Sequence, residues 1–276
     1  MADARAAPRP APEHYVHGHH EAVLRSHRWR TAANSAAYLL DRLTPGTSVL
    51  DVGCGPGTLS ADLAARVAPA PVTAVDSDAD VLVAAREHVR ARGLTNVAFV
   101  HGDVRTIDLE AHDVVHAHQV LQHLADPVGA LARLAELARP GGLVAVRDAD
   151  YAAFAWSPAD DRLERWRALY LEVARAGGGT PDAGRYLLGW AHTAGLDDAV
   201  YTTSTWTFAT PPERAWWADL WAERITASEL GRRLVATGLT RAEELEEIAE
   251  GWRAWARAAG ASFMVPHGEL LVHVDA

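Results

Sequence analysis

Short apolar runs alternate with helix-like patterns through the first half of this 276-residue chain. Runs of valine, leucine and alanine predict strands, and apolar residues spaced three or four apart predict helices between them. The predicted strands cover 48–53, 72–76, 97–101, 113–117 and 143–148, and the predicted helices cover 57–67, 78–92 and 127–138. Parallel strands need crossover connections, and helices must cover both faces of the sheet that such strands form. The pattern therefore predicts an α/β fold with a mostly parallel sheet between two layers of helices.

The pattern changes after Tyr151. The predicted elements there are helices at 160–176, 181–194, 212–227 and 240–259, a strand at 200–208, and a last strand in two parts at 262–264 and 270–274. Roughly fifty residues separate these two strands, which is far more than a hairpin loop needs. We therefore expect 211–260 to be a helical cap, inserted before the last strand of the α/β core formed by 45–210 and 261–276. Such a cap would exclude water from a reaction.

The start of the chain is rich in alanine, proline and arginine, and we expect a disordered tail over 1–14. A helical pattern at 21–43 follows and ends at Pro45-Gly46. We take 15–44 as an N-terminal helical lid.

The composition excludes several functions. The net charge is −10, which argues against nucleic acid or an anionic membrane surface as a partner. The chain contains no lysine, so Schiff-base chemistry and the lysine of a phosphate-binding P-loop are absent. The single cysteine, Cys54, cannot form an internal disulfide, which favours a cytoplasmic protein. No apolar run reaches the roughly 18 residues of a membrane span, so we expect no membrane association.

A glycine-rich turn follows the first predicted strand. Asp51 ends the apolar run, and Gly53, Gly55 and Gly57 follow at alternate positions before a helix begins. Glycines allow backbone N–H groups to approach a ligand closely, which favours a binding loop. The alternative is a tight turn with a structural role only, because such a turn would use the same residues. A dinucleotide fingerprint needs a glycine where Thr58 stands, which disfavours an NAD-linked oxidoreductase.

This motif resembles the first motif of the class I S-adenosylmethionine (SAM)-dependent methyltransferases. The resemblance covers about 45–150 and implies a Rossmann-like sheet of seven strands that binds SAM and releases S-adenosylhomocysteine (SAH). In such sheets the ligand lies beyond the carboxyl ends of the strands. The cofactor residues that the resemblance implies are Asp51, Gly53, Gly55, Gly57, Asp76, Ser77, Asp103, Val104, His118 and Gln119.

Two of these assignments have structural alternatives. Asp76 would accept hydrogen bonds from the ribose hydroxyls, but it could equally cap the next helix at Ser77 or Asp78. Asp103 would accept from the adenine amino group, but aspartate is also common in turns.

The catalytic candidates are His118, Asp150, Tyr15 and His19. Histidine suits proton removal from an acceptor at neutral pH. Asp150 would orient the acceptor or pair with Arg147. His19 belongs to a histidine cluster that could also be a solvated turn, and we expect no metal site there.

We therefore expect an enzyme that moves a methyl group from SAM to a small organic acceptor, on an oxygen, nitrogen or carbon atom. The layout resembles the ubiquinone and menaquinone biosynthesis branch, and the arginine-rich composition suits secondary metabolism in a bacterium. The alternative is an enzyme that binds SAM without methylating and catalyses a cyclisation or rearrangement. A homodimer is left open.

Overall fold

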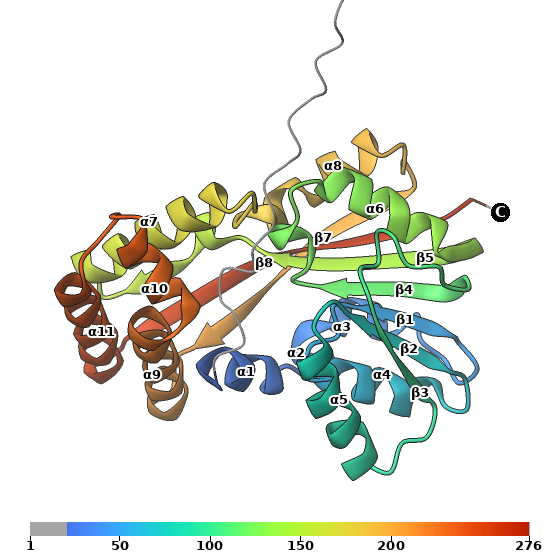
Figure 1. Ribbon diagram of the computed structural model, residues 1–276, viewed down its shortest axis with the longest axis horizontal. Coiled ribbons are helices and arrows are strands. Elements are labelled where there is room, and N and C mark those ends of the chain that lie inside the picture. Colours follow the sequence, from blue (N-terminus) through green and yellow to red (C-terminus); the bar gives the residue numbers. More distant parts are fainter. Residues whose placement is uncertain (1–20, 276) are drawn as a thin grey trace, which may run out of the picture.

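The central sheet organises the molecule, and the computed structural model describes residues 21–275 (Figure 1). Its eight strands are β1 (Val49–Val52), β2 (Val72–Asp76), β3 (Val97–His101), β4 (His112–His118), β5 (Ala138–Ala149), β6 (Ala155–Ser157), β7 (Ala199–Phe208) and β8 (Ser262–His273). The predicted tail over 1–14, together with Tyr15 and His19, lies outside the described residues. Within the described part of the chain, no helix combines the length and the apolar character needed to cross a membrane.

The strand order is β3-β2-β1-β4-β5, all parallel, and β8 then continues the sheet antiparallel to β5. The first three residues of β8 pair with β6, and β7 pairs with β8 along nearly its whole length. The predicted α/β class with a mostly parallel sheet is confirmed. The additional short strand β6 was not predicted.

Helices cover both faces of the sheet (Figure 1). Side chains of a strand alternate between faces, so neighbouring residues of β1 enter different cores. Leu50 packs in the core that includes α6 (Pro127–Glu136) and α8 (Leu187–Thr193). Val49 packs in the core on the other face, against α4 (Thr58–Val67). Helix α5 (Ala79–Ala91) follows β2 beside α4 (Figure 1).

Four further helices gather at the far end of β7 and β8 (Figure 1): α7 (Asp161–Ala176), α9 (Pro211–Ala227), α10 (Glu229–Ala236) and α11 (Ala242–Arg257). Their core is aromatic: the ring centroid of Trp166 in α7 lies 4.5 Å from that of Trp221 and 4.8 Å from that of Trp252. Phe263 of β8 joins the same core. The segment 211–260 therefore shares one hydrophobic core with α7 and β8.

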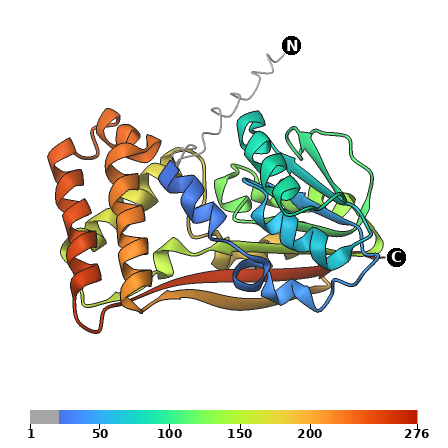
Figure 2. The same cartoon turned by 90° about the horizontal axis from the view of Figure 1, so that it is seen from below.

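The N-terminal stretch that was predicted as one helix is three, namely α1 (Glu21–Arg28), α2 (Ala32–Ser35) and α3 (Ala37–Leu40). Thr31 starts a new helix because its hydroxyl accepts a hydrogen bond from Asn34 N at 3.2 Å. Helix α1 lies between the α9–α11 helices and the α/β core (Figure 2). Arg25 pairs with Glu223 of α9 at 2.9 Å, and the His27 carbonyl accepts from Thr58 Oγ1 at 3.1 Å. Helix α1 thus connects α9 to the glycine-rich turn.

Candidate active site

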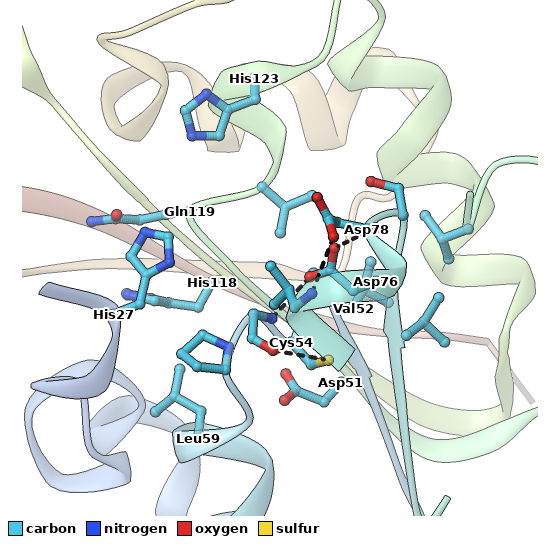
Figure 3. Close-up of a pocket in the computed structure, with 18 of the residues that line it drawn as sticks. His27, Asp51, Val52, Cys54, Leu59, Asp76, Asp78, His118, Gln119 and His123 are labelled. Carbon is cyan, nitrogen blue, oxygen red and sulfur yellow. Dashed lines mark hydrogen bonds between the residues drawn. The ribbon is translucent and has the colours of Figure 1, made fainter. Parts of the chain in front are cut away.

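A cavity of about 480 Å³ lies beyond the carboxyl ends of β1, β2 and β4. Its walls come from the glycine-rich turn, from the residues that follow β2, β3 and β4, from α1 and from α9. Asp76 and Asp78 lie on one side of it, and His27, His118 and Gln119 lie on the other (Figure 3). The polar ends of the central strands therefore meet in one cavity, as the strand order requires.

The glycines of the turn have backbone conformations that other residues rarely adopt. Gly53, Gly55 and Gly57 have φ values of 66°, 53° and 76°. A Cβ on Gly53 would lie 2.5 Å from Cγ2 of Val120, and one on Gly57 would lie 2.9 Å from Cβ of Ala85. The first clash is at the cavity wall and the second is against α5. The turn therefore needs glycine both for its backbone and for the close approach of its neighbours.

Asp51 supports this turn from beneath. It lines the cavity, but its side chain is buried, and its two oxygens accept hydrogen bonds from Ser60 Oγ at 2.5 Å and from His116 Nδ1 at 2.8 Å. The structure thus gives Asp51 a role in positioning the turn, and the cofactor contact that the motif implied stays a prediction.

Asp76 stands between the glycine turn and α5. One carboxylate oxygen accepts from Gly55 N at 2.9 Å and the other from Asp78 N at 3.0 Å. Asp78, and not Asp76, caps α5, because it accepts from Asp80 N at 2.8 Å and from Val81 N. Asp76 therefore accepts the hydrogen bond from Asp78 N that the structural alternative expected, although the N-cap residue of α5 is Asp78. The half-buried Asp76 also lines the cavity beside the exposed Ser77.

Asp103 and Val104 form the wall after β3. Asp103 accepts from Arg105 Nη2 at 2.6 Å and from Arg105 N at 2.9 Å. These hydrogen bonds lower the pKa of the Asp103 carboxyl, so it is ionised at neutral pH. Val104 is buried and offers an apolar surface. Arg105 is a site residue that the sequence motif did not identify.

His118 at the end of β4 lines the cavity and is only 4% exposed. Neither ring nitrogen has a hydrogen-bond partner among the described residues. Burial, with the charges of Arg30 and Arg147 nearby, holds the pKa of His118 well below its usual value, so the ring is neutral. A buried imidazole with two unsatisfied nitrogens inside a cavity is suited to bind a polar ligand group.

Gln119 connects the two sides of this end of the cavity. Its backbone has a φ of 55°, its Oε1 accepts from Arg30 Nη2 at 2.6 Å, and its Nε2 lies 2.9 Å from His267 Nε2. Since His267 Nδ1 donates to the Val265 carbonyl at 2.8 Å, its Nε2 is the acceptor for Gln119. The sequence did not indicate His27, Arg30 or Arg224, which also line the cavity.

Asp150 does not line the cavity. Arg185 donates to both its oxygens at 2.7 Å, and Ala153 N donates to one at 3.1 Å. The alternative pairing with Arg147 is not found either, because Arg147 pairs with Glu269 at 3.2 Å. The structure therefore gives Asp150 a capping role. Within residues 21–275, no group of three histidine, cysteine or acidic side chains is arranged to hold a metal ion.

Asp148 lies behind the cavity and gives a pH prediction. It is fully buried, accepts from Gln122 N at 3.1 Å, and has a pKa raised to about 7 by burial. Between about pH 4 and pH 7 the folded protein keeps a proton on Asp148 that the unfolded chain has released. The free energy of unfolding therefore falls as the pH rises through this range, and the stability that the protonated Asp148 contributes is gone once the pH has passed 7. Asp148→Asn cannot ionise. We expect its stability relative to the wild type to rise between about pH 4 and pH 7, and to be higher than that of the wild type at pH 8 by on the order of 2 kcal/mol.

Urea unfolding at several pH values measures this difference. The buried amide group that asparagine adds in place of Oδ2 offsets part of the gain. Parallel stability curves for the two proteins would contradict a raised pKa for Asp148.

Comparisons with known proteins agree with this geometry. A family model described as "Methyltransferase domain" matches residues 43–179. An uncharacterized methyltransferase of Schizosaccharomyces pombe is 29% identical over 94% of this chain and 95% of its own length. Trans-aconitate 2-methyltransferase of Deinococcus radiodurans is 36% identical over 44% of this chain and 46% of its own.

A solved structure has a similar fold. It is phosphoethanolamine N-methyltransferase 2 of Haemonchus contortus in complex with phosphomonomethylethanolamine and SAH, with a TM-score of 0.57, 16% identity, and coverage of 92% of this chain and 57% of that one. This chain therefore spans about half the length of the Deinococcus and Haemonchus proteins and nearly all of the yeast relative.

The chain belongs to the class I SAM-dependent methyltransferases. The predicted family, enzyme class and donor are confirmed. The residues present also fit SAM: the glycine turn leaves room where Cβ atoms would intrude, Asp76 is placed for hydroxyl groups, and His118 has two unsatisfied nitrogens. The comparisons do not favour the oxidoreductase alternative.

We expect Asp76→Ala to weaken SAH binding by about 1–3 kcal/mol, because it removes a charge-assisted acceptor. The substitution also removes the acceptor of the hydrogen bonds that Gly55 N and Asp78 N donate. Calorimetry with SAH measures the change, and Asp80→Ala, an exposed acid in the first turn of α5, is the control. Unchanged affinity in Asp76→Ala would remove Asp76 from the donor site.

Proposed function

We propose that this enzyme transfers the methyl group of SAM to a small organic acceptor that enters between α1, α9 and the residues after β4. The observation that supports this proposal is the continuity of one cavity from the glycine turn to a group of buried polar side chains at His118. Part of the wall is apolar, through Val120, Leu124 and Tyr151. Relatives named for small acceptors, such as trans-aconitate, also support it.

The bound donor supplies an activated methyl group on a sulfonium, and its sulfur keeps the electron pair of the broken carbon–sulfur bond. The protein mainly holds the acceptor in line and excludes water. His118 is neutral and its pKa is low, so it is a weak base. Its role in this proposal is to orient the acceptor through a hydrogen bond and to take up a proton only from an acidic hydroxyl.

The cover over the cavity comes from two parts of the chain. Helix α1 lies against the glycine turn through His27, and α9 brings Arg224 to the cavity wall. We infer that α1 and the preceding residues form a lid that separates during exchange of substrates. Tyr15 and His19 stay proposed catalytic residues, because they precede this helix. The secondary-metabolism role, cytoplasmic location and quinone-branch relationship likewise stay predictions.

Product mass tests the proposal. The purified protein is incubated with SAM and a panel of phenols, carboxylic acids and amines, and the mixture is analysed by mass spectrometry. We expect SAH and a product that carries one added methyl group. A product of unchanged mass, with SAM intact, would favour the rearrangement alternative, which the comparisons do not favour.

A further inference from the structure

Gln119 has a strained backbone at the edge of the cavity. Its φ of 55° lies in the left-handed region, where only glycines are otherwise found among residues 21–275. A side chain makes this conformation costly, and such residues persist where their surroundings hold them in place, often at ligand sites. Gln119 follows β4 directly and lines the cavity beside His118. Its conformation therefore needs contacts that compensate the cost.

Three hydrogen bonds compensate it. Gln119 N donates to the Arg147 carbonyl of β5 at 2.7 Å, and Gln119 Nε2 donates to His267 Nε2 of β8 at 2.9 Å. Gln119 Oε1 accepts from Arg30 Nη2 at 2.6 Å. An arginine side chain can only donate, which fixes the orientation of the carboxamide, and a charged donor makes a stronger hydrogen bond than a neutral one. Two of the three contacts come from the sheet, and the third comes from the segment after α1.

This segment joins α1 to α2 beside the cavity. His27 of α1 and Arg30 both line the cavity, and Figure 3 shows His27 beside Gln119. The adjacent Trp29 packs against Trp206 of β7, with 5.1 Å between the ring centroids. Helix α1 therefore meets the strand ends through the residues that follow it, and the Arg30–Gln119 hydrogen bond joins it to the end of β4.

A ligand in the cavity meets His27 and Arg30 while α1 lies over it, and loses both contacts when α1 moves away. A ligand shifts a conformational equilibrium by the difference in its affinity for the two states, so the donor favours the position of α1 that the structure shows. The coupling is reciprocal, and α1 in this position raises the affinity for the donor by the same factor. Loss of the Arg30 contact also removes part of the compensation for the strained backbone of Gln119.

We propose that Gln119 is a positioning residue that couples α1 to the donor site, with the Arg30–Gln119 hydrogen bond as a latch. When the latch is formed, α1 covers the cavity and the backbone of Gln119 keeps the conformation that the donor binds. When the latch is broken, α1 leaves the cavity more readily and the donor is held less tightly. This inference rests on the proposed function, in which α1 is part of a lid, and it names the residue that fastens the lid.

Hydrogen exchange measured by mass spectrometry tests the latch, because amide exchange reports local opening. In the full-length wild type, SAH should slow the exchange of the amides of 24–30 by about fivefold or more. Gln119→Ala removes the carboxamide and keeps the backbone strain. Without ligand, it should speed up the exchange of these amides about tenfold, and calorimetry should show SAH binding weakened by about the same factor.

Gln119→Gly separates the backbone from the side chain, and it folds without strain because glycine readily adopts a φ of 55°. We expect α1 to exchange as fast as in Gln119→Ala, and SAH to bind about threefold more tightly than in Gln119→Ala. Gln122→Ala is the matched control. It removes the other carboxamide near the end of β4, which accepts from Ala149 N at 3.2 Å and contacts His123. The exchange of α1 should be unchanged in this variant.

The exchange of α1 and the affinity for SAH separate the outcomes. Unchanged exchange of α1 in both Gln119 variants would mean that other contacts hold α1, and any loss of SAH affinity would then make Gln119 a simple donor contact. Equally fast exchange in Gln122→Ala would mean a general loosening of this end of the sheet. Either result overturns the latch. If SAH binds the wild type without slowing the exchange of α1, the lid and the latch are both wrong and the donor site stands. If the wild type does not bind SAH, the proposed function itself fails.

Discussion

Replacing Gly53 by alanine is expected to weaken SAH binding by at least about 30-fold, which corresponds to about 2 kcal/mol. Gly53 has a φ of 66°, a region that costs an ordinary residue roughly 1–2 kcal/mol. The new Cβ would also lie 2.5 Å from Cγ2 of Val120, which lines the same cavity. The turn and Val120 must therefore move apart, and the backbone N–H groups leave the positions that the donor needs.

The chain offers a matched control at Gly260. Its φ is 68°, and a Cβ there meets no atom within 4 Å. Gly260→Ala therefore carries the same backbone strain without the contact, and we expect reduced stability with unchanged SAH affinity. Calorimetry on both variants measures the difference. If Gly53→Ala binds SAH within about threefold of the wild type, the glycine turn does not hold the donor as described.

Replacing Glu269 by glutamine is expected to reduce the free energy of unfolding by about 3 kcal/mol. Glu269 of β8 pairs with Arg147 at 3.2 Å, and their side chains are only 7% and 1% exposed. Glu269 also accepts from Ser204 and Thr202 of β7. Glutamine keeps the shape but removes the charge, so the buried guanidinium of Arg147 loses its closest compensation. Burial already lowers the pKa of Arg147 to about 10.

Urea unfolding at pH 7 measures this effect, with Glu247→Gln on the exposed side of α11 as the control. Asp148 directly follows Arg147 in the sequence, and its negative charge also raises the pKa of Arg147. In Glu269→Gln the pKa of Asp148 should therefore fall. If Glu269→Gln lowers the free energy of unfolding by less than about 1 kcal/mol, Asp148 already compensates the charge of Arg147. The Arg147–Glu269 pair would then have no major role in stability.

The parallel half of the sheet could be predicted from the sequence because each strand is short, apolar and followed by its own turn. The course of β8 could not. Pro266 and Gly268 interrupt its pattern, but β8 continues through them because β7 pairs with it on one side. Gly268 is required there, since a Cβ would lie 1.9 Å from the carbonyl oxygen of Gly184. A glycine that allows close packing cannot be distinguished by sequence from one that ends a strand.

The site was predictable only where its residues follow a strand of the motif directly. Gly53, Asp76, Asp103 and His118 reach the cavity because the parallel strands end at one edge. Arg224 reaches it by the packing of α9 against α1, nearly two hundred positions away along the chain. No local pattern encodes such a contact, because it depends on the aromatic core that places α9. The same reason explains why the pairing of Asp150 with Arg185 was not predicted: Arg185 is 35 residues further on.

A crystal structure of the protein with SAH tests the central claim most directly. The account predicts the ribose hydroxyls at the carboxylate of Asp76, the adenine beside Asp103 and Val104, and the sulfur end of the ligand toward His118 and Gln119. A ligand bound outside this cavity, or a nucleoside that contacts neither Asp76 nor Asp103, would contradict it.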